Sequence, residues 1–276
     1  MLTSLNIITP KHKNGVIKLI NKLRGDGIGD ELLRSGRFEL RRITYISRSG
    51  KVKPKKLYKH LGKDSVVLAD EGARLPGGIN RFCDNSFSER LCVNMALEIL
   101  RNISDPTELR LGIYDPGAVA ADFLLEALRL CRSPVAVTYD FLPYDRVRRL
   151  ALAQLGAAAV ITKSARELKG CDFIVAPARI SAYIPVKKDA VVLTAGEPYI
   201  RLCGSVYHSY DVTLPPEIEK LRPPELCAEY FGSAVYSLYG QYRLGSLVPN
   251  LCAGKNGNLT VRELAHSLNK KARCPI

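Results

Sequence analysis

The sequence predicts an α/β protein with a doubly wound parallel sheet, a smaller α/β domain before it and a helical extension after it. Three observations support this prediction. Strand-like and helix-like patterns alternate along most of the 276 residues. From residue 109 onward the strand-like segments are nearly continuous apolar runs, as expected when helices cover both faces of a sheet. The composition, 46% hydrophobic and 25% charged, is typical of soluble globular proteins.

Residues 1–104 are predicted to form the small α/β domain and to end in a linking helix. Apolar residues alternate in the strand-like segments and recur at helical spacing in the others. The expected order is strand, helix, strand, helix and strand, at 5–9, 15–23, 38–46, 54–61 and 65–70. This order favours a small parallel sheet.

A long polar loop follows and is the candidate substrate-binding segment. It leaves the carboxyl end of a strand, where open α/β sheets keep their ligands, and Arg is suited to bidentate contacts with carboxylates or phosphates. The candidate residues are Arg74, Asn80, Arg81 and Asn85. The alternative is a surface loop that packs on a neighbour. A capping-box spacing from Ser86 to Glu89 then predicts the linking helix, through about Asn102.

Residues 105–200 are predicted to form the larger domain, and residues 201–276 an arm and helices that pack back. Strands are expected at 109–114, 134–139, 157–161, 172–176 and 190–194, and helices at 117–131, 145–155 and 164–170. Right-handed crossovers stack such units into one Rossmann-like parallel sheet. The tail is expected to hold an extended segment at 205–214 and helices at 225–240 and 260–270, the last capped by Thr260.

The stretch LRLGIYDPGAVAADF, residues 109–123, places a turn between a strand and a helix. The order of a small α/β domain, a linking helix and this larger domain resembles the shikimate dehydrogenase and glutamyl-tRNA reductase group of two-domain dehydrogenases. In that group a Gly-x-Gly-x-x-Gly/Ala turn follows the first strand. The corresponding positions are Asp115, Gly117 and Ala120, of which the first departs from the pattern. The resemblance implies NAD or NADP as cofactor.

Asp115 has a second interpretation, because Asp followed by Pro is a strong signal for a helix start. Its carboxylate would then occupy the anion site of its own helix N-terminus. Asp140 ends the next strand, where an acidic residue can bind a ribose hydroxyl or cap the following turn. Together with residues after two later strands, the predicted cofactor-binding set is Asp115, Gly117, Ala120, Asp140, Ala176 and Gly196.

Catalytic residues are not assigned by the sequence, and no metal site is predicted. Only Tyr207–Asp211 gathers acid–base groups, with His208 and Tyr210 on one strand face; a structural histidine is the alternative. The eight cysteines are scattered without a Cys-x-x-Cys pair, which predicts reduced thiols and a cytoplasmic protein. No metal-hydrolase, serine-hydrolase or P-loop motif occurs. No apolar run approaches the roughly 20 residues of a membrane span, and no secretory signal is visible.

The net charge of +14 is concentrated near the N-terminus, since residues 1–63 hold 16 Lys and Arg against 4 Asp and Glu. Such a one-sided field attracts phosphates, nucleic acid or an acidic partner, and a solvated basic face is the alternative.

These features lead to one hypothesis and one alternative. The first is a nicotinamide-dependent oxidoreductase that binds a small anionic substrate in a cleft between its domains. The alternative is a non-catalytic Rossmann-like module that binds a nucleotide-like metabolite, or nucleic acid through residues 37–63. The sequence leaves the reaction, the presence of catalysis and the oligomeric state open.

Overall fold

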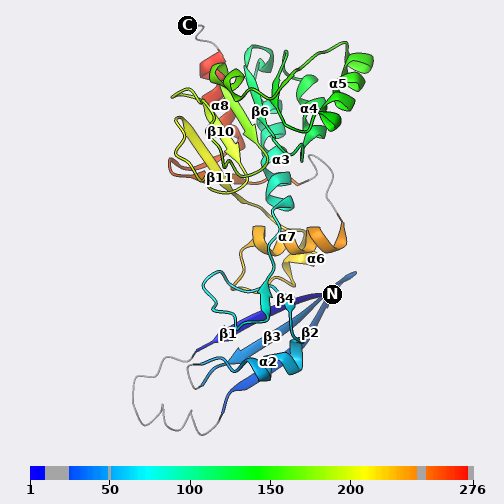
Figure 1. Cartoon of the computed structure of the whole chain (residues 1–276), viewed down its shortest axis with the longest axis vertical. Coiled ribbons are helices and arrows are strands. Elements are labelled where there is room, and N and C mark those ends of the chain that lie inside the picture. The colour runs from blue at the N-terminus through cyan, green and yellow to red at the C-terminus, as the bar shows by residue number, and fades with distance from the viewer. Residues whose placement is uncertain (10–24, 49–50, 241–246, 273–276) are drawn as a thin grey trace. The chain divides into compact units, whose positions relative to one another are not determined.

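The computed structural model describes residues 1–9, 25–48, 51–240 and 247–272, and the chain forms two compact units (Figure 1). The first unit combines Met1–Asp84 with Leu214–Gly240, and the second combines Asn85–Thr213 with Gln241–Ile276. The helix predicted at 15–23 lies outside the described residues.

This division differs from the predicted boundaries at 104/105 and 200/201. Helix α3 (Ser86–Asn102), expected to link two domains, belongs to the second unit, because its apolar side chains pack on that unit's sheet. Ser86 is its first helical residue and Asn85 its N-cap, so the helix begins one residue earlier than a cap at Ser86 implies.

The first unit contains a three-stranded sheet in the order β1-β3-β2. Strands β1 (Leu2–Ile8) and β3 (Phe38–Ile46) are parallel, and β2 (Gly27–Ser35) is antiparallel to β3. The parallel pairing expected of the predicted strands is confirmed for β1 and β3, whereas β2, whose antiparallel pairing makes the sheet mixed, was not predicted. The physical reason for the antiparallel pairing is the tight turn between β2 and β3 at Gly36, whose φ is +57°, because so short a turn can only join antiparallel strands.

Helices pack against both faces of this sheet. On one face, α2 (Pro54–Leu61) buries Leu57 against a core that includes Ile43 and Tyr45. On the other, Phe38 meets Tyr239 of α7 (Ala228–Tyr239) edge-on, with ring centroids 5.0 Å apart. The parallel pair β4 and β5 and the short helix α6 complete the unit, at Ser65–Val67, Ile79–Arg81 and Pro216–Glu219.

The second unit contains an eight-stranded sheet in the order β13-β12-β11-β10-β9-β6-β7-β8. The strands are β6 (Leu111–Tyr114), β7 (Val135–Val137), β8 (Val160–Thr162), β9 (Phe173–Ala176), β10 (Val191–Thr194), β11 (Ser205–Asp211), β12 (Leu251–Gly254) and β13 (Gly257–Thr260). Strands β6 to β11 are parallel to one another, whereas β12 and β13 form an antiparallel hairpin that the sequence analysis did not predict. The parallel strands have the order 3-2-1-4-5-6 of a doubly wound Rossmann-like sheet, so the predicted fold class is confirmed.

Helices and short turns cover this sheet. Helix α3 packs on β9, β10 and β11, and α8 (Val261–Ala272) packs on α3. Helices α4 (Ala121–Leu128) and α5 (Phe141–Leu155) lie together near β6–β8 (Figure 1). Two 3₁₀ helices lie at Pro106–Glu108 (η1) and Ala165–Gly170 (η2). The predicted cap of α8 is confirmed, because the Thr260 and Glu263 side chains and amides form a reciprocal capping box.

The described residues contain no helix that is long and apolar enough to cross a membrane. The seven cysteines among them are all free thiols.

Candidate functional site

The order of the second sheet reverses between β6 and β9, and ligands of such sheets bind beside the carboxyl ends of the strands at this point. All six predicted cofactor-binding residues lie at this carboxyl edge. The turn after β6 holds Asp115, Gly117 and Ala120, and the ends of β7, β9 and β10 lead to Asp140, Ala176 and Gly196. Because these strands are parallel, one edge of one sheet carries the whole set.

Asp115 is fully buried, and its carboxylate accepts three hydrogen bonds. Oδ1 accepts from the amide of Val119 at 3.0 Å. Oδ2 accepts from the amide of Ala120 and from the hydroxyl of Tyr144, each at 2.9 Å. Burial raises the pKa of this carboxyl above its ordinary value, and the three hydrogen bonds oppose that effect because they stabilise the charged form.

The second interpretation of Asp115 is wrong in one respect, because Asp115 is not the N-cap of the next helix, although its carboxylate does bind the amides that precede it. Helix α4 begins at Ala121, and its N-cap is Ala120. Between Asp115 and this helix, Ala118 takes a left-handed conformation, with φ +52°. The amide of Ala118 donates to the carbonyl of Asp115 at 3.1 Å. The chain therefore makes a separate turn before the helix, and Asp115 binds the amides of that turn.

This turn does not fit a pyrophosphate in the way that a Gly-x-Gly-x-x-Gly loop does. In such loops the backbone amides before the helix face the phosphates, whereas here two of them face the Asp115 carboxylate. Gly117 does leave room, because an added Cβ would meet only the Val119 side chain, at 3.7 Å. Ala120 is buried, as close helix–strand packing requires.

Asp140 acts as the N-cap of α5, since its Oδ1 accepts from the amide of Leu142 at 3.2 Å. The capping alternative for this residue is thus observed. The turns after β6 and β7 also expose apolar side chains that the sequence analysis did not single out, namely Val119, Tyr139, Phe141 and Leu142. The amide of Tyr139 donates to the carbonyl of Pro116 at 3.1 Å, which holds the turns after β6 and β7 together.

The loops after β9 and β10 are also fastened to each other. Thr194 donates its hydroxyl to the carbonyl of Ala178 at 3.1 Å, and Arg179 donates to the carbonyl of Glu197. The Arg179 guanidinium stacks on the Tyr199 ring, 3.7 Å from its centroid. Gly196 has φ +93°, a left-handed conformation that favours glycine, so the shape of the turn is sufficient reason for a glycine at this position.

The predicted substrate residues are divided between the units. Arg74, Asn80 and Arg81 belong to the first unit, and Asn85 to the second. The Arg81 guanidinium donates to the carbonyls of Asp70 and Ala73, both at 2.8 Å, so it holds its own loop together. Arg74, Asn80 and Asn85 are exposed, and their role in substrate binding stays a prediction.

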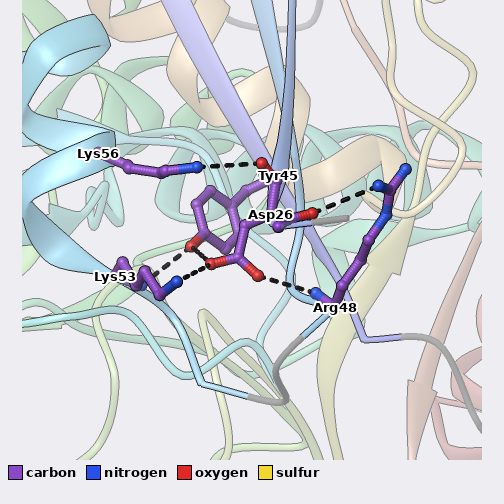
Figure 2. Close-up of polar contacts among 6 residues, drawn as sticks. Asp26, Tyr45, Arg48, Lys53 and Lys56 are labelled. Carbon is purple, nitrogen blue, oxygen red and sulfur yellow. Dashed lines mark hydrogen bonds and ion pairs between the residues drawn. The ribbon is translucent and has the colours of Figure 1, made fainter. Parts of the chain in front are cut away.

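In the first unit a buried carboxylate is surrounded by basic residues (Figure 2). The Asp26 side chain is 1% exposed. Its carboxylate accepts from the Tyr45 hydroxyl at 2.9 Å and the Arg48 amide at 3.0 Å, and it lies 3.4 Å from Lys53 Nζ. Lys56 donates to the Asp26 carbonyl at 3.1 Å. One negative charge thus lies among three positive charges, and the group keeps a positive surplus.

No family model and no curated protein matches this chain. Solved structures with some likeness include Δ1-pyrroline-2-carboxylate reductase of Thermococcus litoralis with NADH and L-proline, at 10% identity and TM-score 0.31, covering 65% of this chain and 61% of that one. Iminosuccinate reductase of Paracoccus denitrificans with NAD+ has 13% identity and TM-score 0.29, covering 64% and 61%. L-tryptophan dehydrogenase of Nostoc punctiforme has 9% identity and TM-score 0.35, covering 98% and 78%. The chain therefore spans about 61% of the length of the first two.

Proposed function

We propose that the second unit binds NAD or NADP at the carboxyl edge of its parallel sheet, and that the chain is an oxidoreductase acting on a small anionic substrate. The observation that carries the proposal is the 3-2-1-4-5-6 order of β6–β11, which dinucleotide-binding domains use to bind their ligand at the point of reversal. A fold by itself does not assign a function, so the side chains at this edge must supply the rest.

The exposed side chains beside β6 and β7 support a nucleoside at this edge. Tyr139 is 59% exposed, so its ring offers a face on which a base can stack, and Val119 and Leu142 expose apolar side chains in the same two chain segments. The carboxylate of Asp140 lies next in the chain, and a ribose hydroxyl could donate to it. The sequence of the second unit holds 21 Lys and Arg against 15 Asp and Glu, and this positive surplus favours an anionic substrate by long-range attraction.

The phosphates are the weak point of the fit. Since Asp115 holds the amides of Val119 and Ala120, a pyrophosphate must use other donors, and we expect a lower affinity than an intact glycine fingerprint provides. No reaction step is assigned to particular residues of the chain.

A thermal-shift experiment with NAD, NADH, NADP and NADPH at millimolar concentration tests the proposal. A ligand that binds only the folded state raises stability by about 2.7 kcal/mol at a hundred times its Kd, which shifts the unfolding temperature by several degrees. The variant Tyr139→Ala should lose this shift. The matched control is Tyr183→Ala, which truncates another exposed tyrosine of the same unit. Failure of all four nucleotides to stabilise the protein, or an equal loss in the control, would reject the proposal.

A second candidate function is binding of nucleic acid by the first unit, favoured by the surface of α2. Lys55, Lys59 and Lys63 on and after this helix are exposed and make no ion pair within the described part of the chain. They add to the positive surplus around Asp26. Affinity for a DNA duplex should then fall steeply with salt, with a slope near −0.9 for each phosphate contacted.

The test of this second function compares Lys55→Glu/Lys59→Glu with the control Lys188→Glu, an exposed lysine of the second unit. The double variant spares Lys53 and Lys56, which contact Asp26 and help to hold the fold. Equal DNA affinity and equal salt slopes in the double variant and the control would dismiss this function.

A further inference from the structure

We propose that a pocket beside β11 in the second unit binds a small organic monocarboxylate with a short apolar chain. The pocket has a volume of about 200 Å³. Its walls come from the loop after β10, from β11 itself and from the turn between β12 and β13. Its lining includes none of the six predicted cofactor-binding residues, and the proposal does not depend on binding of a dinucleotide.

Each of these three segments contributes one basic side chain to the pocket: Arg201, His208 and Lys255. Lys255 lies 3.3 Å from the carboxylate of Glu197, which also lines the pocket. The side chains of Arg201 and His208, in contrast, make no hydrogen bond or ion pair to any residue that the structure describes. The lining therefore has one more fixed positive charge than negative charge, and two of its nitrogen-bearing groups have unused donor capacity. An anion satisfies both conditions.

The remaining lining is apolar. Ile200, Leu202 and Val206 are half-buried and pack against the core on that face of the sheet, so this part of the pocket is formed before a ligand arrives. A compact inorganic anion would leave these side chains in contact with water, whereas an aliphatic carboxylate would cover them. The volume lies below the 300–1,000 Å³ usual for drug-sized ligands, which restricts the occupant to a small molecule.

Two glycines fix the walls of the pocket. Gly204 has φ +85°, and a Cβ there would lie 2.6 Å from the carbonyl oxygen of Ala190. Gly254, at the start of the β12–β13 turn, would place a Cβ 2.0 Å from the carbonyl oxygen of Val206. At both glycines the backbone therefore lies in close contact with a neighbouring segment, where a side chain would not fit. The amide of Gly196 also donates to the carbonyl of His208 at 3.0 Å, which holds the loop after β10 to β11. The pocket is thus a consequence of fixed backbone positions.

Calorimetric titration of the whole protein at low salt and without nucleotide tests the proposal, with butyrate as the probe. Neutral butyramide tests the need for charge, and inorganic phosphate tests the apolar part. We expect butyrate to bind at millimolar concentration and more tightly than either comparison compound. Arg201→Gln should weaken butyrate about tenfold, because one charge-assisted contact is lost. The control Arg166→Gln, an exposed arginine of the same unit, should leave the affinity unchanged.

Three results would overturn the proposal. Equal affinities for butyramide and butyrate would show that the basic side chains contribute nothing. Phosphate would match butyrate only if the apolar lining is irrelevant. An equal effect of Arg201→Gln and Arg166→Gln would show that the anion is held elsewhere. None of these measurements involves NAD or NADP, so failure here and failure of the proposed function are distinguishable.

Discussion

Replacing Asp115 by alanine removes the acceptor for two backbone amides and one hydroxyl in the interior of the second unit. The Tyr144 ring is fully buried, so its hydroxyl cannot turn to water. Each buried donor left without a partner costs about 1–3 kcal/mol. Burial of the Asp115 carboxyl is itself unfavourable, and its loss offsets part of this cost. We therefore expect Asp115→Ala to lower the free energy of unfolding by about 3–5 kcal/mol.

The assay is urea unfolding followed by circular dichroism, together with hydrogen exchange at the amides of Val119 and Ala120. Exchange reports on the second unit even where the two units unfold separately. Asp122→Ala is the matched control, because this half-exposed aspartate of α4 forms, within the part of the chain that the structure describes, a single ion pair, with Arg90 at 2.8 Å. Equal losses of stability in the two variants, or unchanged exchange at both amides in Asp115→Ala, would refute this account of the turn.

The same carboxyl gives a pH dependence with a defined sign. Burial raises its folded-state pKa above the ordinary 3.8, so the folded protein binds the proton more tightly than the unfolded chain. Stability from this group is therefore greatest below pH 3.8 and is lost as the pH rises through the folded pKa. In Asp115→Asn this dependence disappears, so the stability of the wild type minus that of the variant should fall as the pH rises through this window. A difference that rises with pH would mean that the hydrogen bonds outweigh burial.

Three further perturbations have clear expectations. Gly112→Ala should lower the free energy of unfolding in urea by about 1–3 kcal/mol, because the added Cβ would lie 2.7 Å from Leu168 Cδ2. Gly117→Ala is the control and should have little effect, because its Cβ would lie 3.7 Å from the Val119 side chain. Thr260→Ala should lower the free energy of unfolding by about 1 kcal/mol in the same assay, because it removes the capping box of α8, and an unchanged stability would contradict a role for this cap. The Arg41 guanidinium lowers the pKa of Asp30, so Arg41→Gln should raise that pKa, as measured by NMR of the carboxyl carbon during a pH titration. An unchanged pKa would mean that the pair does not form in solution.

The centre of the large sheet could be predicted from the sequence because β6, β9 and β10 are buried on both faces. Such strands are continuous apolar runs, and β9 and β10 lie within the predicted ranges 172–176 and 190–194. The exposed elements did not give this signal. Strand β2 reads GIGDELLRS and is largely exposed, so it lacks an apolar run. The β12–β13 hairpin did carry a recognisable signal, the Asn256-Gly257 pair typical of a tight turn between strands.

The candidate site was less accessible to sequence reasoning because its contacts join distant residues. The carboxyl edge itself was predictable, since it follows from the ends of parallel strands. The role of Asp115 was not, because it depends on Tyr144 in α5 and on the left-handed turn at Ala118. Asp followed by Pro is also a normal helix start, and nothing local distinguishes the two outcomes. The pocket beside β11 was hidden for the same reason, since one wall belongs to the unpredicted hairpin.

The internal carboxylate at position 115 suggests a decisive experiment on the cofactor. Asp115→Gly supplies the first glycine of the fingerprint and releases the amides of Val119 and Ala120. Because two charge-assisted hydrogen bonds to a phosphate become available, we expect the affinity for NAD or NADP to rise at least tenfold while stability falls. Affinity must be measured directly by calorimetry below the unfolding temperature, since a thermal shift would combine the two opposite effects.

The control for this experiment separates the amides from simple electrostatics. Asp122→Asn removes a negative charge from the first turn of α4 but leaves the Asp115 hydrogen bonds in place. A larger gain in Asp115→Gly than in Asp122→Asn means that the carboxylate competes with the phosphate for the amides. Equal gains mean that each substitution only removed a negative charge that repels the phosphates, and that the Asp115 carboxylate does not compete with a phosphate for the amides. No gain in either variant means that the turn after β6 does not contact the phosphates, and the proposed cofactor site at this edge is then wrong.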